Sequence, residues 1–439
     1  MLSSTRPMRR PVARTLQATA GVAAVALALT ACGGGSDEGA AEEDGPITLK
    51  VATFNDFGYT DEMLAEYTKE HPNVTVEHVK AATTDDARSN MTTKLAAGGE
   101  GLADIEAIEV DWLPELSQYP DLFTDLADPE LDGRWVDWKV QQATTPDGKV
   151  IGYGTDIGPE AICYRSDLFE EAGLPTDREE VAELLGGEDA TWEDYFEVGK
   201  DFVKESDAAW YDSAAGTFQG MINQLPAAFE DPETGEPTDL ATNTDVKDIY
   251  DEITASSGDL SAGLEQWGDD WVAGFQADAF ATMLCPAWMT GPIEQNSGGI
   301  EGWDIADVFP GGGGNWGGSF LTVPASGEHT EAAKELAAWL TAPEQQTKAF
   351  ETSGTFPSQI EAQESEAVQS FTNEFFNDAP VGQIFSTRAQ SIEGAPYKGA
   401  HYFAIRDEVT NALNRVDLTK SQSPEEAWDE AVEKAAALG

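Results

Sequence analysis

The chain has 439 residues, of which 25 are Lys or Arg and 81 are Asp or Glu, so its formal net charge at pH 7 is −56. Hydrophobic residues make up 41% of it, which is typical of a globular protein and too high for a disordered one. At roughly 100 to 200 residues per domain, this length predicts two or three domains. So negative a surface repels nucleic-acid phosphates, which argues against a nucleic-acid partner.

The first 31 residues are typical of a secretion signal. Four arginines, the last at position 14, precede an apolar run over residues 18–29 that is too short to span a bilayer as a stable helix. Leu29-Thr30-Ala31-Cys32 then resembles the lipobox of bacterial lipoproteins, in which the chain is cut before a cysteine that becomes acylated. The resemblance implies a lipid anchor at Cys32 on the extracellular face of the cell membrane, in a bacterium that we expect to be Gram-positive. The alternative is an ordinary cysteine after an ordinary cleavage site.

After Cys32, residues 33–45 are Gly, Ala, Ser and acidic residues, followed by Pro46. This composition predicts that residues 32–46 form a flexible tether. Removal of residues 1–31 takes away four of the 25 basic residues and none of the 81 acidic ones, so the mature charge is −60. In an oxidising compartment Cys163 and Cys285 are able to form a disulfide, and the alternative is two buried thiols. Neither cysteine has a partner at zinc spacing and no two histidines stand four apart, so we expect no metal site.

Strand-like and helical patterns alternate from residue 47 onward. Strand character covers residues 47–54, 74–79 and 104–110, and helical character covers the stretch capped by Thr60 and residues 85–97. This order predicts a mostly parallel sheet flanked by helices, in which ligands bind beyond the carboxyl ends of the strands. Those ends carry Asp56 and Phe57 after the first strand, and Asp111 and Trp112 after the third.

The second half of the chain continues the alternation. Short strands are expected at 161–164, 280–284 and 319–324, and helices from 166, from 191, over 330–340, over 405–413 and over 424–438. A glycine-rich loop covers 310–318 and lacks the Gly-Lys-Ser/Thr ending of a phosphate-binding loop. There is no nucleophile-elbow motif of the G-x-S-x-G type.

Four segments also carry a resemblance to a known family. They are 161–169 (AICYRSDLF), 281–288 (ATMLCPAW), 336–346 (LAAWLTAPEQQ) and 402–406 (YFAIR). In this order they resemble the carbohydrate-type extracellular solute-binding proteins of ATP-driven importers, the family that includes maltose-binding protein, and within it the cello-oligosaccharide branch. Pro286-Ala287-Trp288 stands where the family has Gly-Pro-Trp.

The resemblance implies an α/β protein with a two-lobed periplasmic-binding-protein-like fold of type II, each lobe a mostly parallel sheet flanked by helices. Residues 47–157 and 319–358 would form the N-terminal lobe, and residues 159–317 and 359–439 the C-terminal lobe. Crossings between the lobes are expected near 156–159, 317–320 and 357–360. The resemblance also implies an oligosaccharide ligand in the cleft between the lobes and the membrane subunits of an ABC permease as partners, and we expect a monomer.

The family's sugar contacts match Asp56, Phe57, Asp111, Trp112, Trp288 and Tyr402 in this sequence, and Asp156, at the first crossing, is expected to contact the ligand as well. Phe57 and Trp112 stand where maltose-binding protein has basic residues, which speaks against maltose. A pyranose has an apolar face and a rim of hydroxyls, so its site needs aromatic platforms and oxygen acceptors. Trp271, Trp303 and Trp316, each beside an Asp or Asn, are therefore further candidates. For each Trp the alternative is core packing.

These patterns predict a binding protein that needs no cofactor and no catalytic residue, and they favour a β-linked gluco-oligosaccharide such as cellobiose. Two alternatives stay open: a secreted carbohydrate-active enzyme that uses two acids, and a binding protein for a cationic solute such as a polyamine. A neutral sugar does not require the acidity, for which adaptation to a salty or alkaline exterior is our hypothesis.

Overall fold

The computed structural model describes residues 45–81 and 83–438. The expected signal segment 1–31, the lipidation site Cys32 and the tether up to residue 44 lie outside the described residues. In the part that the structure describes, no helix is long and apolar enough to cross a membrane.

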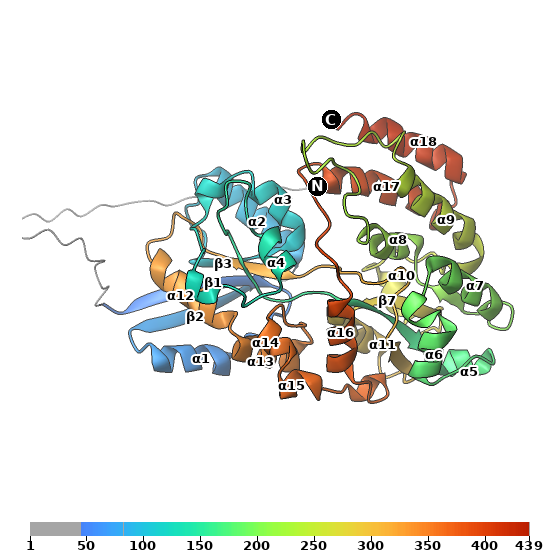
Figure 1. The fold of residues 1–439 in the computed structure, drawn as a ribbon, viewed down its shortest axis with the longest axis horizontal. Coiled ribbons are helices and arrows are strands. Elements are labelled where there is room, and N and C mark those ends of the chain that lie inside the picture. The colour runs from blue at the N-terminus through green and yellow to red at the C-terminus, as the bar shows by residue number, and fades with distance from the viewer. Residues whose placement is uncertain (1–44, 82, 439) are drawn as a thin grey trace, which may run out of the picture. The chain divides into compact units, whose positions relative to one another are not determined.

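Two sheets organise the described chain (Figure 1). The first has the order β2-β1-β3-β9-β4 and consists of β1 (Ile47–Phe54), β2 (Val74–Ala81), β3 (Ile105–Glu109), β4 (Tyr153–Gly154) and β9 (Ser319–Thr322). Strand β1 pairs in parallel with β2 and β3, as the sequence predicts, whereas β9 is antiparallel to β3 and β4.

The second sheet has the order β6-β7-β5-β8 and consists of β5 (Glu160–Arg165), β6 (Ala209–Tyr211), β7 (Phe280–Pro286) and β8 (Trp303–Ala306). Strand β5 is antiparallel to both β7 and β8, and only β6 and β7 pair in parallel. Both sheets are therefore mixed, which corrects the expectation of a mostly parallel sheet in each lobe. Every residue of β5, β7 and β8 is buried, and the hydrophobic pattern of a strand buried on both faces does not reveal its direction.

Helices surround both sheets. In chain order they are α1 (Asp61–Glu70), α2 (Thr84–Ala96), α3 (Leu113–Leu116), α4 (Asp137–Gln142), α5 (Ser166–Glu171), α6 (Arg178–Leu184), α7 (Trp192–Phe202), α8 (Ala214–Ile222), α9 (Thr244–Leu260), α10 (Asp269–Gly274), α11 (Thr290–Ser297), α12 (Thr330–Leu340), α13 (Pro343–Ser353), α14 (Ile360–Gln363), α15 (Glu366–Gln369), α16 (Val381–Gln390), α17 (Tyr402–Asp417) and α18 (Pro424–Ala435). Short 3-10 helices are η1 (Val110–Trp112), η2 (Pro120–Leu122), η3 (Pro129–Leu131), η4 (Gly187–Asp189), η5 (Ala287–Met289) and η6 (Glu374–Phe376).

Local sequence signals start several helices. The Thr60 side chain accepts the Met63 amide at the start of α1, and the Thr191 and Asp194 side chains form a reciprocal capping box at the start of α7, as their spacing predicts. These bonds satisfy amide groups that have no partner within a helix.

Three clusters of buried side chains form the core. One packs β1 and β3 against α1 and α12. The other two lie on opposite faces of the second sheet, because successive side chains of a strand point to opposite faces. Ile162 and Tyr164 of β5 pack with α8, α9 and α17, whereas Cys163 packs with α11 and α16. Cys163 and Cys285 are joined by a disulfide between β5 and β7, with 5.4 Å between their Cα atoms.

Three segments run side by side between the sheets and are called the crossings here: 155–160, 314–319 and 356–359. The Trp316 amide donates to the Gly158 carbonyl and the Ile157 amide donates to the Phe356 carbonyl, each over 2.9 Å. That the lobe boundaries lie in these segments stays a prediction. That the two sides move relative to one another stays a prediction.

Candidate functional site

Four tryptophans, which we call the tryptophan cluster, gather beside the crossings: Trp267, Trp271, Trp288 and Trp316. Trp288 lies in η5, immediately after β7. Its indole donates to the Trp316 carbonyl over 2.7 Å, and the two rings are perpendicular with centroids 5.7 Å apart. Trp267 stacks on Trp288 at 6.0 Å with 25° between the planes, and it is 57% exposed. Trp271 is buried beneath Trp267 at 5.1 Å. The cluster therefore presents aromatic surface on a buried support.

Glycines of the crossings allow this close approach. A Cβ at Gly158 would lie 1.9 Å from the Trp316 carbonyl oxygen and 2.9 Å from the Trp288 indole nitrogen. Gly317 has a φ of +83°, and a Cβ there would lie 3.1 Å from the Trp288 nitrogen and 3.6 Å from a Glu109 carboxylate oxygen. Any larger residue at Gly158 would displace the backbone. The same contacts place the Glu109 carboxylate close to the Trp288 indole.

Two carboxylates lie at the end of β3. Glu109 accepts the Asp111 amide over 2.7 Å. Burial raises the pKa of Glu109 to about 8, and repulsion from Asp111 acts in the same direction. Asp111 binds the Lys398 ammonium at 3.3 Å and the Arg406 guanidinium at 3.7 Å. Burial alone would lower the pKa of Lys398, but the Asp111 carboxylate overcomes this and the net shift is upward.

A buried glutamate holds the segment that carries Lys398. Glu230, which is 1% exposed, accepts the amides of Gly399 and His401 over 2.8 Å each. The Lys398 ammonium lies 5.0 Å from the centre of the Tyr402 ring. The ion pairs of Asp111 therefore connect the first sheet to a fixed segment before α17.

Buried polar groups without partners lie near these ion pairs. Both carboxylate oxygens of Glu160, the amide nitrogen of Asn223 and the hydroxyl of Tyr402 have no hydrogen-bond partner among the described residues. The neighbourhood is connected, because Arg406 donates to Gln219 over 3.3 Å and Gln219 donates to Asn223 over 3.0 Å. Buried polar groups are nearly always bonded in folded proteins, so these groups suit a ligand.

Glu160 is the most isolated of these groups. A Cβ at Gly220 of α8 would lie 3.4 Å from one carboxylate oxygen, and a Cβ at Gly314 would lie 2.6 Å from the other, so backbone covers it on two sides. Burial raises the pKa of Glu160 to about 8, and the Lys398 ammonium partly opposes this shift.

The structure places the ten predicted ligand residues in different surroundings. Trp271, Trp288 and Trp316 meet in the tryptophan cluster, and Asp111 and Tyr402 meet around Lys398. Asp156 is buried and bonds the Ser319 amide and the Thr155 hydroxyl, so it binds the crossings together.

The remaining four have other surroundings. Asp56 is exposed and pairs with Lys80 at 3.2 Å. Phe57 and Trp112 are buried and both contact Phe54, with ring centroids at 5.1 and 5.4 Å from it. Trp303 is 1% exposed and packs in the core of the second sheet. The side-chain environment of Trp303 is that of a core residue, and a ligand role for these four stays a prediction.

Sequence reasoning missed Trp267, Glu160, Asn223 and Lys398. Trp267 stands between Gln266 and Gly268, and turn residues beside an aromatic were a usable signal. Glu160 is a charged residue at the first position of an entirely buried strand. Asn223 carried no signal, and Lys398 was notable only as one of few cations in an acidic chain.

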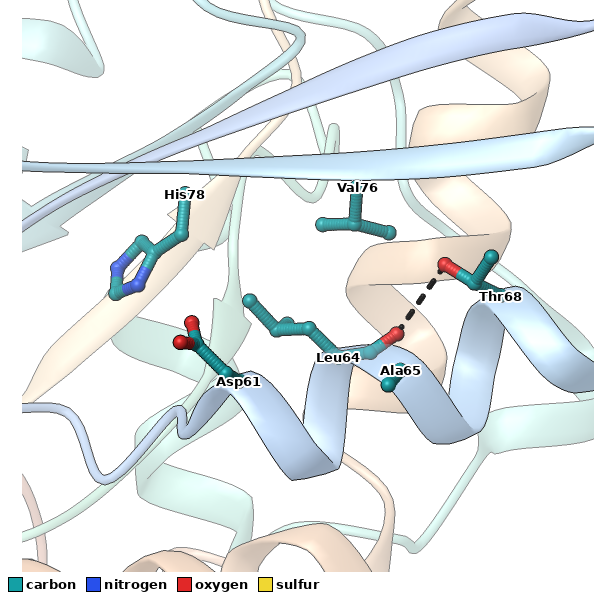
Figure 2. A pocket seen from close by; sticks show the side chains of 6 residues that line it. All are labelled: Asp61, Leu64, Ala65, Thr68, Val76 and His78. Atoms are coloured by element: carbon teal, nitrogen blue, oxygen red, sulfur yellow. Dashed lines mark hydrogen bonds between the residues drawn. The ribbon is translucent and has the colours of Figure 1, made fainter.

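A pocket also lies between α1 and β2, lined by Asp61, Leu64, Ala65, Thr68, Val76 and His78 (Figure 2). The Thr68 hydroxyl bonds the Leu64 carbonyl within the helix, and His78 bonds Thr53 on β1. Its polar groups are thus partly engaged, and it contains none of the predicted ligand residues. Across the described residues, no group of three or more His, Cys, Asp or Glu is placed to hold a metal ion.

Comparison with known proteins defines the class. Residues 62–376 match the family described as bacterial extracellular solute-binding protein, and the chain belongs to this family. A crystal structure named "Extracellular solute-binding protein family 1" is 48% identical and superposes with a TM-score of 0.83, covering 90% of this chain and all of that one. The resemblance to extracellular solute-binding proteins and the expected fold class are confirmed.

Two relatives are named as binding proteins for sugars. The arabinooligosaccharide-binding protein of Halalkalibacterium halodurans is 24% identical over 393 residues, which cover 85% of each chain. The lactose-binding protein of Rhizobium radiobacter is 24% identical over 253 residues, 56% of this chain and 57% of that one. A binding protein from B. animalis subsp. lactis Bl-04, solved with β-1,6-galactobiose, is 20% identical with a TM-score of 0.69 over 89% of this chain and 95% of that one, and shows the fold alone.

Proposed function

We propose that this protein is the solute-binding subunit of an ABC sugar importer and captures an oligosaccharide between the two sheets. The observation that carries the proposal is the tryptophan cluster, which places aromatic surface beside the Glu109 carboxylate at the crossings. Indole faces pack on the apolar face of a pyranose, and carboxylates accept its hydroxyl groups. A neutral sugar needs both.

The polar half of the site would bind the sugar rim. We propose Asp111, Glu109 and Glu160 as hydroxyl acceptors, with Lys398 and Tyr402 as donors. Lys398 and Arg406 already neutralise Asp111, so this part of the site is unfavourable for a polyamine or another cationic solute. Nothing in this arrangement requires a catalytic residue or a cofactor.

The names of the relatives support an oligosaccharide, because they include an arabinooligosaccharide, lactose and β-1,6-galactobiose. Within this class we propose a β-linked ligand and take cellobiose as the first candidate, since flat β-linked chains fit successive aromatic platforms. Binding would stabilise a closed arrangement of the two lobes 47–157 with 319–358 and 159–317 with 359–439, and the permease would accept that form.

Anchoring is a separate proposal that rests on the sequence alone. We propose that Cys32 is acylated and holds the monomer on the extracellular face of the membrane of a Gram-positive bacterium. Cys32→Ala should then release the protein from the membrane fraction into the medium, and full retention would contradict the anchor.

A thermal-shift screen tests the binding function. Cellobiose, lactose, maltose, arabinobiose and spermidine are compared, because a ligand at one hundred times its Kd adds about 2.7 kcal/mol of stability. We expect a shift with a sugar and none with spermidine. Absence of a shift with every sugar of a wider panel would overturn the proposal, as would hydrolysis of the bound sugar by the pure protein.

The variant Trp288→Ala then tests the site. We expect it to lower the affinity for the bound sugar at least tenfold. Tyr119→Ala is the matched control. Tyr119 is an aromatic residue that is 56% exposed, stands immediately before η2 and lies outside the tryptophan cluster. Equal losses in both variants would contradict the assignment.

A further inference from the structure

Trp267 combines two unusual properties. It is the only tryptophan in the described part of the chain that is largely exposed. Its φ is +70°, in the left-handed region that L-residues with bulky side chains rarely occupy. Left-handed helical geometry costs a non-glycine residue about 1 to 2 kcal/mol. Neither the exposure of the ring nor the backbone strain stabilises the fold, so Trp267 in this conformation lowers the stability of the protein.

The neighbours of Trp267 are held by one buried carboxylate. Asp212, which is 2% exposed, accepts the side-chain amide of Gln266 over 2.7 Å and the indole nitrogen of Trp271 over 2.9 Å. The Gly268 amide closes a turn onto the Glu265 carbonyl over 3.0 Å. Contacts on both sides of Trp267 thus impose its conformation. Strained residues persist where their surroundings over-determine them, and such places cluster at binding sites.

The stacking of Trp267 on Trp288 defines where the exposed ring lies. Their planes are 25° apart and their centroids are 6.0 Å apart. Nearly parallel rings at this separation are offset sideways rather than superposed. Trp267 therefore extends the aromatic surface beyond the edge of Trp288.

We propose that Trp267 forms an outer sugar subsite next to Trp288, so that the site binds at least two consecutive sugar units and selects ligands by chain length. The inference rests on the proposed function and adds the residue that determines ligand length. The buried support through Asp212 and Trp271 holds the ring rigidly, which reduces the conformational entropy lost on binding.

Affinities along a ligand series test the proposal. Glucose, cellobiose, cellotriose and cellotetraose are titrated into the full-length mature protein and into Trp267→Ala, Trp267→Gly and the control Tyr119→Ala. In the wild type we expect at least one step of the series to increase the affinity tenfold or more. Both Trp267 variants should lose that step while their affinity for the shorter ligand changes less than twofold, and Tyr119→Ala should keep it.

Melting temperatures separate this role from a structural one. Gly relieves the left-handed strain and Ala does not, so Trp267→Gly should melt higher than Trp267→Ala. If Trp267 instead only covers the core, both substitutions should weaken the binding of every sugar equally and lower the melting temperature. That result would overturn the proposal. Unchanged affinities in both variants, as expected for a contact with the permease, would overturn it too. If the wild type binds no sugar at all, the proposed function fails and the subsite fails with it.

Discussion

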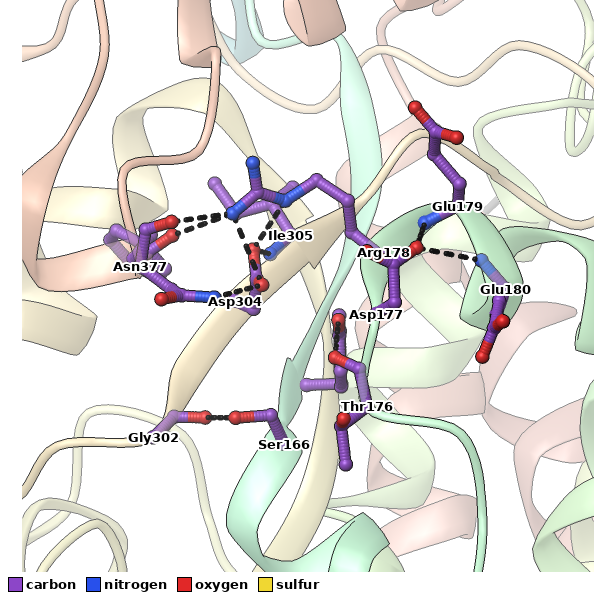
Figure 3. Close-up of polar contacts among 12 residues, drawn as sticks. Ser166, Thr176, Asp177, Arg178, Glu179, Glu180, Gly302, Asp304, Ile305 and Asn377 are labelled. Carbon is purple, nitrogen blue, oxygen red and sulfur yellow. Dashed lines mark hydrogen bonds and ion pairs between the residues drawn. The ribbon is translucent and has the colours of Figure 1, made fainter.

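Asp304 and Glu160 are buried carboxylates of the second sheet, on the neighbouring strands β8 and β5, and their surroundings differ. Asp304, which is 1% exposed, accepts two bonds from the Arg178 guanidinium at 2.9 and 3.2 Å and one from the Asn377 amide at 3.2 Å (Figure 3). It also accepts the Ile305 amide over 2.8 Å. Glu160 is 0% exposed and has no hydrogen-bond partner within the described residues.

The two surroundings correspond to two uses of a buried carboxyl group. The pair of Asp304 and Arg178 joins α6 to β8, and Arg178 also bonds the Asn377 carbonyl over 2.6 Å, so this network is complete and stabilises the fold. A buried carboxylate without donors destabilises the protein on its own. We therefore expect Glu160 to gain its hydrogen bonds from the ligand.

Removing the charge of Asp304 should have the largest effect. Asp304→Asn leaves the Arg178 guanidinium without its counter-charge, and the free energy of unfolding should fall by on the order of 3 kcal/mol. Urea unfolding at pH 7 measures this loss. Glu160→Gln is the matched control, since Glu160 is largely protonated at pH 7 and has no hydrogen-bond partner among the described residues, and it should not destabilise. Equal stability of Asp304→Asn and the wild type would contradict the comparison.

The pH dependence of stability should be next in size. The pKa of Glu160 is about 8 in the folded protein and 4.5 as a free side chain, so between these values the folded state binds more protons than the unfolded state. Stability should therefore fall as the pH rises through this window, by up to about 1.4 kcal/mol per pH unit from this group. The charged group that acts on the pKa of Glu160 is Lys398, and the backbone of Gly220 in α8 and of Gly314 in the glycine loop lies beside its carboxylate oxygens.

Glu160→Gln isolates that contribution. Glu109, whose pKa is also raised to about 8, is present in both proteins, so the difference between their unfolding curves reports Glu160. We expect a flatter pH profile for the variant between pH 5 and about 8. Parallel profiles would show that Glu160 is not buried without partners in solution.

Sugar binding should respond to the same substitution by a smaller free energy. The pKa of about 8 keeps Glu160 largely protonated at pH 7, so its hydrogen bonds to the sugar are those of a neutral group. Such a bond contributes about 0.5 to 1.5 kcal/mol, so Glu160→Gln should weaken binding of the sugar found in the screen about two- to tenfold. Isothermal titration calorimetry measures the affinity, and Glu230→Gln is unsuitable as a control because it would release Lys398. Asp304→Asn, studied below its unfolding transition, should keep the wild-type affinity.

Salt should have the smallest effect and should not distinguish the two carboxylates. Raising the salt concentration from 0.1 to 1 M shortens the Debye length from about 10 to about 3 Å and screens the acidic surface. The melting temperature should rise by a similar few degrees in the wild type, Asp304→Asn and Glu160→Gln, because both carboxylates are buried. Stability that is indifferent to salt would refute the hypothesis that the acidity is an adaptation to a salty or alkaline exterior.

Local sequence determined much of this protein. Caps such as Thr60 and Thr191 begin helices where their spacing predicts, and the predicted helix over 330–340 is α12. The four family motifs led to the correct family. Each of these features depends on residues close together in the chain, where hydrogen bonding and backbone geometry act.

Tertiary structure alone decided the direction of the strands in the second sheet and which polar groups are left without partners. Trp303 and Trp267 both stand beside turn or acidic residues in the sequence, yet Trp303 is buried and Trp267 is exposed. Glu160 and Asp304 are one acidic residue each among 81, and only the packing of α6 and α8 gives Asp304 an arginine and leaves Glu160 facing glycines. Burial and pairing are set by segments distant in the chain, and a single sequence does not contain that information in its local pattern.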